Sequence, residues 1–296
     1  MENLDRKKSD QEILSSLIDI IPSIKNYHSP SSKEYKFFSK IAKTSSENLF
    51  GPNNKDEINF GQFGSLNFPY FEMGTINSTH LFGFDELILF SFYYQNRNNY
   101  KKVADLGANI GLHSIIMSKL GFAVTSYEPD QIHFEKIKNN ISLNSVKSNP
   151  TIVNKAISTE AGYVEFVRVK GNTTGSHIKG AKDSPYGDLE TIKVETDSFK
   201  EIINNFDFLK IDVEGYEAKI LLSTSHSEWL TTDAMIEVGS KKNAELIYDF
   251  FESEKINLFS QKNSWNKVEK LEDMPVSYKD GSLFISSKLF VPWESK

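Results

Sequence analysis

The hydrophobic and polar positions of this chain alternate with two different spacings, and these spacings predict its helices and strands. Apolar residues three and four positions apart indicate amphipathic helices, whereas short apolar runs bounded by turn residues indicate strands. Helices are expected at residues 9–21, 84–95, 112–120, 131–143 and 244–251. Strands are expected at residues 103–106, 122–127, 150–156, 163–169, 190–194, 206–212, 234–238, 257–260 and 282–287. Strands that alternate with helices in this way predict an α/β fold.

The stretch 103–111 carries the most informative pattern, because an apolar strand is followed at once by a Gly-x-Asn-x-Gly turn and a helix. Gly107 has no Cβ, so the backbone there can turn sharply and approach a ligand, and Gly111 lets the helix start close to its strand. The next strand ends in Glu128. An acidic residue ~20 positions after a glycine turn is where such folds hold a pair of ribose hydroxyls. The sequence therefore predicts a site for a nucleoside-bearing cofactor.

The residues of this turn distinguish between two classes of cofactor. A dinucleotide site prefers a glycine where the backbone meets the pyrophosphate, and this chain has Asn109 there. Asp105, two residues before the first glycine, would repel a pyrophosphate but suits the amino group of an amino-acid cofactor. The pattern therefore favours S-adenosylmethionine over a nicotinamide dinucleotide. Asn154 and Ala156, at the end of the third strand, are expected beside its adenine ring.

A second acidic stretch follows the strand predicted at 206–212, where Asp212 and Glu214 precede another glycine turn. Ligands of open α/β sheets bind beyond the carboxyl ends of the strands, so both carboxylates are candidates to receive an acceptor proton or position a sulfonium. Glu214 is equally well explained as a charge that stabilises the N-terminus of the next helix. Glu237, near the end of a later strand, and His177, in a long polar loop, are further candidate bases. The alternative for His177 is that it is exposed to solvent and has no catalytic role, as is common for a histidine in a loop.

Composition narrows the setting of this site. The chain of 296 residues has a net charge of −6, which argues against a general nucleic-acid surface, and its 39% hydrophobic content is ample for a packed core. It has no cysteine, so disulfides and thiolate ligands are excluded, and no spacing diagnostic of a metal site. The charged N-terminus lacks the apolar core of a signal peptide, and no run approaches the ~20 apolar residues that span a bilayer. A cytoplasmic protein without membrane insertion is expected.

Residues 1–83 are expected to form an N-terminal extension to a domain at residues 84–296. After the first helix, Ser31 and Glu34 form a capping-box pattern that opens a second helix. Residues 58–76 are rich in glycine and aromatic residues, which predicts extended segments with turns. The two helices are interpreted as packed on the core, and the alternatives are a lid over the site or a contact between copies in a homo-oligomer.

Several spaced motifs resemble the FkbM family of S-adenosylmethionine-dependent methyltransferases. They are DLGANIG at 105–111, SYEPD at 126–130, NNISLN at 139–144 and LKIDVEGYE at 209–217. The resemblance covers about residues 84–290. It implies a Rossmann-like class I methyltransferase fold, with a mostly parallel seven-stranded sheet whose last strand is antiparallel, and S-adenosyl-L-methionine as the cofactor. The contacts that it implies for this cofactor come from Asp105, Gly107, Asn109 and Glu128, with Asp212 and Glu214 near the methyl group.

Members of this family typically O-methylate sugars or natural products, so the resemblance favours a small-molecule or glycan hydroxyl as the acceptor. A hydroxyl acceptor needs a base, and Asp212 is preferred among the candidate bases because it lies at a rigid strand end. An N-methyltransferase that acts on a peptide or an amine would need less help from a base. The third alternative is a catalytically silent cofactor-binding partner protein, and the presence of both Asp105 and Glu128 speaks against it.

Overall fold

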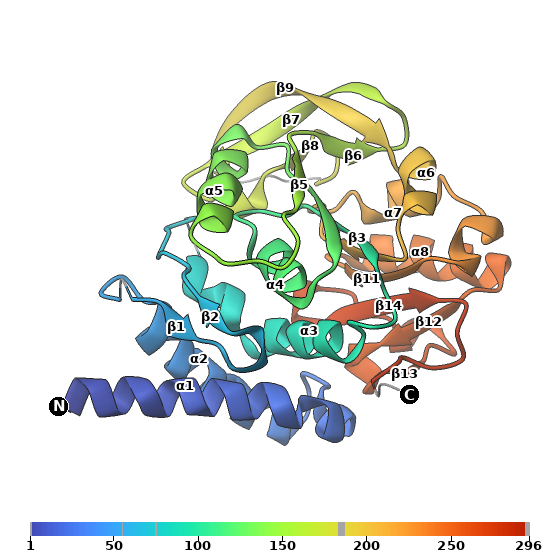
Figure 1. Cartoon of the computed structure of the whole chain (residues 1–296). Helices are drawn as coiled ribbons and strands as arrows, with labels where there is room; N and C mark the ends of the chain where they lie inside the picture. Colours follow the sequence, from blue (N-terminus) through green and yellow to red (C-terminus); the bar gives the residue numbers. More distant parts are fainter. Residues whose placement is uncertain (1, 55, 75, 183–186, 294–296) are drawn as a thin grey trace.

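The computed structural model describes residues 2–54, 56–74, 76–182 and 187–293, and it confirms the α/β class (Figure 1). Its α-helices are α1 (Glu2–Ile20), α2 (Lys33–Phe50), α3 (Phe84–Gln95), α4 (Leu112–Leu120), α5 (Gln131–Ser142), α6 (Phe199–Ile202), α7 (Glu217–Leu221) and α8 (Lys241–Glu254). Its strands are β1 (Ile58–Asn59), β2 (Ser65–Leu66), β3 (Lys102–Leu106), β4 (Ala123–Tyr127), β5 (Thr151–Val153), β6 (Ala156–Ser158), β7 (Gly162–Lys170), β8 (His177–Ile178), β9 (Asp188–Ser198), β10 (Phe208–Ile211), β11 (Asp233–Glu237), β12 (Asn257–Ser260), β13 (Asn266–Lys267) and β14 (Ser282–Ser286).

The central sheet has eight strands in the order β13-β12-β14-β11-β10-β3-β4-β5. The five strands from β11 to β5 are parallel, so their carboxyl ends lie along one edge. Strand β14 is antiparallel to both of its neighbours, β11 and β12. The sequence led us to expect seven strands, and the eighth is the two-residue β13, which pairs with β12.

The glycine turn after β3 has the conformation that its sequence predicts. Gly107 and Gly111 have φ angles of 80° and 88°, in the left-handed region that only glycine adopts easily. A Cβ on Gly107 would lie 1.8 Å from the carbonyl oxygen of Asp212, so the turns after β3 and β10 are in direct backbone contact. On the other side, Gly111 packs against Ile137 of α5. The glycines therefore bring the ends of neighbouring strands close together.

A second, smaller sheet with the order β6-β9-β7-β8 lies at the top of Figure 1, above the central sheet. The predicted hairpin between residues 163–169 and 190–194 is confirmed, because β7 and β9 pair antiparallel along their length. The strand predicted at 150–156 is instead divided between β5 of the central sheet and β6 of the second sheet. The chain thus leaves one sheet and enters the other within a few residues.

Hydrophobic side chains pack on both faces of the central sheet, because successive residues of a strand point to opposite sides. On β3, Val103 belongs to the core on one face and Ala104 to the core on the other. The first core also contains Leu14 of α1 and Phe50 of α2, whereas the second contains Trp229. The N-terminal helices are therefore continuous with the core of the central sheet.

Helices α1 and α2 lie below α3 at the bottom of Figure 1, far from the second sheet. Helix α1 begins before the expected residue 9. The cap of α2 is Ser32, whose Oγ accepts a hydrogen bond from Tyr35 N at 3.0 Å, whereas the expected Ser31 bonds to Ser29. Within the part of the chain that the structure describes, none of the helices combines the length and apolar character needed to cross a bilayer.

Candidate active site

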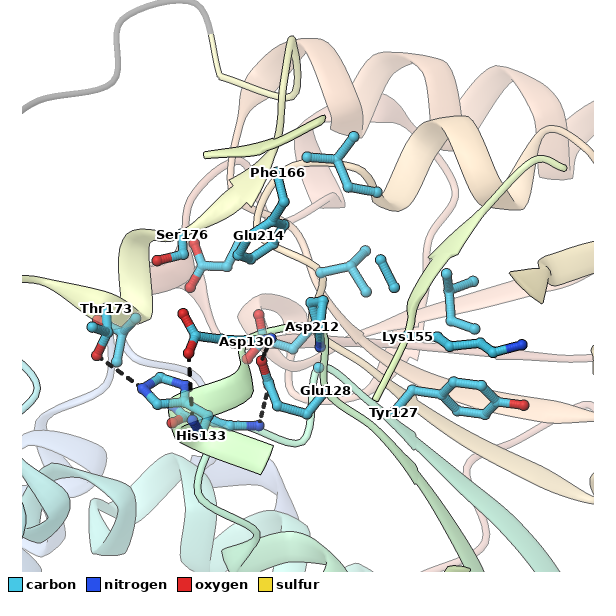
Figure 2. Close-up of a pocket in the computed structure, with 18 residues that line it drawn as sticks. Tyr127, Glu128, Asp130, His133, Lys155, Phe166, Thr173, Ser176, Asp212 and Glu214 are labelled. Atoms are coloured by element: carbon cyan, nitrogen blue, oxygen red, sulfur yellow. Dashed lines mark hydrogen bonds between the residues drawn. The ribbon is translucent and has the colours of Figure 1, made fainter. Parts of the chain in front are cut away.

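A cavity of about 630 Å³ opens at the carboxyl ends of β3, β4 and β10. The central sheet contributes Gly107, Glu128 and Asp212 to its wall, and the second sheet contributes Phe166 and Ser176. Figure 2 shows Glu128 and Asp212 on one side of this space and Phe166 and Ser176 on the other. We call it the first cavity.

Glu128 joins the two turns that border the first cavity. Its Oε2 accepts a hydrogen bond from Asn109 N and its Oε1 accepts one from Asp130 N, both at 2.8 Å. Asn154 Nδ2 donates to the carbonyl oxygen of Glu128 at 2.9 Å and so fixes the backbone behind it. Burial raises the pKa of Glu128 to about 8, against the two backbone N–H donors, which lower it. Each carboxylate oxygen has a second lone pair, so Glu128 can accept further hydrogen bonds from a ligand.

Two buried acceptors near the glycine turn have no hydrogen-bond donor among the described residues. Asp105 is completely buried, and its Oδ2 accepts from Ser114 Oγ at 2.6 Å while its Oδ1 accepts no hydrogen bond. Asn109, in the wall of the first cavity, has an unpartnered Oδ1 and a left-handed φ of 53°. Buried acceptors without donors are costly, which suits a ligand that brings donors. An ammonium group and ribose hydroxyls are such donors, so these residues fit S-adenosylmethionine.

Asp212 and Glu214 lie after β10, as the sequence predicts, and each faces a lysine. Asp212 Oδ2 is 3.3 Å from Lys210 Nζ, and Glu214 Oε2 is 2.6 Å from Lys182 Nζ. Glu214 has a φ of 54°, an unusual backbone conformation that often marks functional sites. Burial raises its pKa to about 7, helped by the negative charge of Asp212 and opposed by Lys182.

A larger cleft of about 1810 Å³ adjoins the first cavity, and we call it the second cavity. Asp212 and Glu214 line both, so they stand at the boundary between them. The second cavity is otherwise lined by Glu237, by polar side chains such as Asn243, and by the largely exposed ring of Tyr278. A ligand in the first cavity and another in the second would therefore meet at these two carboxylates.

Of the remaining residues that the sequence predicts for the site, some line one of the two cavities and others do not. Ala156 lines the first cavity and Glu237 the second, whereas Asn154 and Gly111 support the turns around them. His177 is buried on β8 rather than solvated, its Nδ1 lies 2.8 Å from the carbonyl oxygen of Gly175, and it lines neither cavity. Its neighbours in the chain face the first cavity, and side chains of a strand alternate between faces.

Sequence reasoning missed the contacts that hold the second sheet over the first cavity. Asp130, within the SYEPD motif, caps α5 and accepts a hydrogen bond from Arg168 Nε of β7 at 2.6 Å. His133 of α5 lies 2.9 Å from Thr173 Oγ1, and Figure 2 shows this pair at one end of the cavity. The acidic residue at the start of a helix was a usable signal for Asp130, but its partner could not be identified without the fold.

One family model and several known proteins are similar to this chain. A family model described as the Methyltransferase FkbM domain matches residues 105–255. Methyltransferase sdnD from Sordaria araneosa is 23% identical over 168 residues, which are 46% of this chain and 65% of that relative's length. The N-terminal domain of human METTL16 in complex with SAH is similar with a TM-score of 0.40 and 12% identity, over 87% of this chain and 84% of that chain. An O-methyltransferase from Bacillus cereus in complex with SAH has a TM-score of 0.35 and 10% identity, over 66% of this chain and 78% of that chain.

Proposed function

The chain belongs to the FkbM methyltransferase family, and from this premise we propose that it transfers a methyl group from S-adenosylmethionine to a hydroxyl of a sugar, glycan or natural product. S-adenosyl-L-methionine is the cofactor, and when bound it supplies an electrophilic methyl group on a positively charged sulfur. One observation carries the proposal: Glu214, with a pKa of about 7, lies on the boundary between the first cavity and the larger second cavity.

The first cavity is the proposed cofactor site. Glu128 would accept hydrogen bonds from the ribose hydroxyls, and the free Oδ1 of Asn109 provides a further acceptor in the same wall. Asp105 lies just behind the turn, where its charge would attract the ammonium group of the cofactor. Gly107 lets the turn after β3 lie directly against the turn after β10, because a Cβ there would be 1.8 Å from the carbonyl oxygen of Asp212. Ala156, at the start of β6, belongs to the wall expected beside the adenine ring.

We assign the role of general base to Glu214, although the sequence alone favoured Asp212. A base works best when its pKa lies near the working pH, and the pKa of Glu214 is about 7. Asp212 also faces an ammonium, that of Lys210, so the presence of an ion pair does not distinguish the two carboxylates. Glu214 would accept the hydroxyl proton as the oxygen–carbon bond forms and the carbon–sulfur bond breaks, which leaves a neutral thioether and the protonated carboxyl group.

The second cavity is the proposed acceptor site. This cleft, of about 1810 Å³, is larger than the first cavity and leaves room for an acceptor beside the two carboxylates. Ser240 and Asn243 offer hydrogen-bond partners for hydroxyl groups, and the exposed ring of Tyr278 offers an apolar face for a sugar ring. Holding the acceptor oxygen in line with the methyl carbon supplies much of the expected rate enhancement.

Calorimetric titration of S-adenosylmethionine tests the cofactor site. We expect the wild type to bind it, and Glu128→Ala to bind it about 10- to 100-fold more weakly because the proposed hydrogen-bond partner of both ribose hydroxyls is lost. Glu128→Gln, which keeps one acceptor oxygen, should fall between them. Glu135→Ala is the control, because Glu135 is an exposed residue of α5 whose partners among the described residues are its helix neighbours Lys138 and Gln131. No heat and no thermal stabilisation by excess cofactor in the wild type would contradict the proposal.

Methyl transfer from labelled cofactor to a panel of sugars, glycans and amines tests the reaction. With an accepted hydroxyl substrate, Glu214→Gln is expected to lower the turnover rate by about 10²- to 10⁴-fold and to spare cofactor binding. Full turnover in Glu214→Gln combined with its loss in Asp212→Asn would return the assignment of the base to Asp212. Labelling of amines alone would instead identify an N-methyltransferase.

A further inference from the structure

Lys210 occupies an unusual place for a lysine, since it lies within the central sheet and its side chain is only 12% exposed. It pairs in register with Asp105 of the neighbouring strand β3. Its Nζ is 3.3 Å from Asp212 Oδ2 and 3.9 Å from Asp105 Oδ1. The ammonium therefore stands between the carboxylate proposed to attract the cofactor and the one at the boundary of the two cavities.

Two further carboxylates face the same point. Glu86 of α3 and Glu237 of β11 line a small cavity of about 440 Å³ together with Lys210 and Asp212. Burial raises the pKa of Glu237 well above its usual range, as do the charges of Asp212 and neighbouring acids. Burial alone would lower the pKa of Lys210, but the surrounding carboxylates outweigh it and raise that pKa.

Some of the charged groups in and around this cluster also have partners other than Lys210. Glu86 Oε2 lies 2.9 Å from His113 Nε2, and His113 Nδ1 lies 2.9 Å from the hydroxyl of Tyr93. Asp85 also lines the small cavity, but its two oxygens accept hydrogen bonds from Tyr35 and Gln261. Glu214, on the turn after β10, pairs with Lys182. Lys210 thus faces more negative charge than a single ion pair would supply.

We propose that Lys210 is a positioning residue for the methyl-transfer site, whose ammonium balances the buried carboxylate of Asp105 and the partly exposed carboxylates of Asp212, Glu86 and Glu237. This inference rests on the proposed function, because the ligand that the cluster receives is the cationic cofactor. With the lysine present, the cluster already carries negative charge before the cofactor binds. Lys210 does not line the first cavity, so it would act on the cofactor through Asp105 and Asp212.

Lys210 would fill this role through its charge. Carboxylates that are crowded into a partly buried site do not all remain ionised without a cation, and the protons that they then bind belong to the cluster as a whole. If Lys210 is removed, the cluster should bind an additional proton. A cationic cofactor that enters must then expel this proton, so binding becomes coupled to proton release. A lysine that only fills space would leave this coupling unchanged.

The test counts the protons released when S-adenosylmethionine binds. Calorimetric titrations of the full chain at pH 7, in buffers with different heats of ionisation, give this number directly. We expect Lys210→Met to release about one proton more per cofactor than the wild type, by linkage between proton and ligand binding. Lys210→Arg keeps the charge and should match the wild type. Lys119→Met is the control, because Lys119 is also largely shielded from solvent but, among the described residues, donates hydrogen bonds to the backbone carbonyls of Ser65 and Ser145 rather than to carboxylates.

If the wild type and Lys210→Met release equal numbers of protons when the cofactor binds, this inference is overturned, but the proposed function is not. If Lys210→Met fails to fold, the double variant Lys210→Met/Asp212→Asn, which removes one charge of each sign, takes its place. We expect the double variant to fold and to release the wild-type number of protons, and an extra proton from it would overturn the inference. Absence of cofactor binding by the wild type would instead overturn the proposed function, and the inference with it.

Discussion

At the scale of single residues, the buried Glu128 and the partly exposed Glu214 differ in the groups that hold their carboxylates. Glu128 is fixed by two backbone N–H groups, which belong to turns that cannot move independently of the sheet. Glu214 is held by the flexible side chain of Lys182, at the boundary of the two cavities. The first arrangement suits a residue that binds and stays still, and the second suits one that exchanges a proton.

The charge of Lys182 should therefore set the pH dependence of the reaction. The base must be deprotonated, so the rate of the wild type should rise with pH through about 7. Lys182→Met removes the cation that lowers the pKa of Glu214, and this rising limb should move to higher pH. We expect slower turnover at pH 6–7 and recovery at pH 8–9, measured as the pH–rate profile with saturating cofactor.

Lys179→Met is the control for this experiment. Lys179 forms a similar ion pair, 2.8 Å from Glu165, but both side chains are more than half exposed on the second sheet. Removal of the Lys179 charge should leave the pH–rate profile unchanged. A uniform loss of rate in Lys182→Met, with no displacement of the limb, would show that the lysine does not act through Glu214.

The site residues that the sequence predicts are close to one another in the chain or follow successive strands. The residues that it misses are brought together by tertiary packing. The turn residues Asp105 to Gly111 and the acid Glu128 follow strands in a fixed order, so the sequence could locate them. Lys210 belongs to a recognised motif, yet its partners Glu86 and Glu237 come from a helix and a strand far apart in the chain. Only the packing of α3 against the sheet shows that these charges meet.

At the scale of elements, the second sheet covers the first cavity because it is bound to α5. Arg168 of β7 donates to Asp130, whose other oxygen caps α5 by accepting from Ile132 N at 2.8 Å. The Asp130 side chain is 1% exposed and that of Arg168 is 15% exposed. Arg168 and nearby donors lower the pKa of Asp130, so its carboxylate stays charged although buried. The same turn also supplies a backbone donor to Glu128.

Removing the arginine should consequently destabilise the fold. Arg168→Met leaves the buried charge of Asp130 without its partner, and breaking a buried ion pair in this way costs about 3–5 kcal/mol. We expect a loss near the lower end, about 3 kcal/mol, in the free energy of unfolding measured by urea denaturation. Cofactor affinity should fall as well, because the sheet that covers the cavity loses its anchor.

An exposed ion pair supplies the comparison for this prediction. Lys138→Met breaks the contact between Lys138 and Glu135 on the surface of α5, and such pairs are worth about 0–1 kcal/mol. The double variant Arg168→Met/Asp130→Asn should recover part of the stability lost in Arg168→Met. Equal effects of Arg168→Met and Lys138→Met would mean that the pair does not anchor the second sheet.

The elements that the sequence could not predict depend on such tertiary contacts. The apolar pattern continues through residues 150–156, yet the chain changes sheets there because Asn154 bonds to the carbonyl oxygens of Glu128 and Pro129. Strand β8 has only two residues, and it forms because β7 offers a partner. The β7–β9 hairpin, in contrast, alternates strongly over many residues and was predictable.

At the scale of the whole molecule, the N-terminal helices and the central sheet share one core. Leu14 of α1 and Val103 of β3 are both completely buried in the same hydrophobic cluster. Tyr35 of α2 donates a hydrogen bond to Asp85 of α3 at 2.5 Å, and Gln261 donates to the same carboxylate at 2.6 Å. The extension thus contacts α3 beside Glu86, which faces Lys210.

This shared core should make the extension and the site unfold together. Leu14→Ala leaves a cavity in α1, and such substitutions cost about 2–5 kcal/mol. Because the core is continuous, we expect amides of α1 and of β10 to lose hydrogen-exchange protection by the same amount, and cofactor to restore both. Leu222→Ala, at a position 39% exposed, should change neither. Loss of protection in α1 alone would show that residues 1–83 fold as a separate unit.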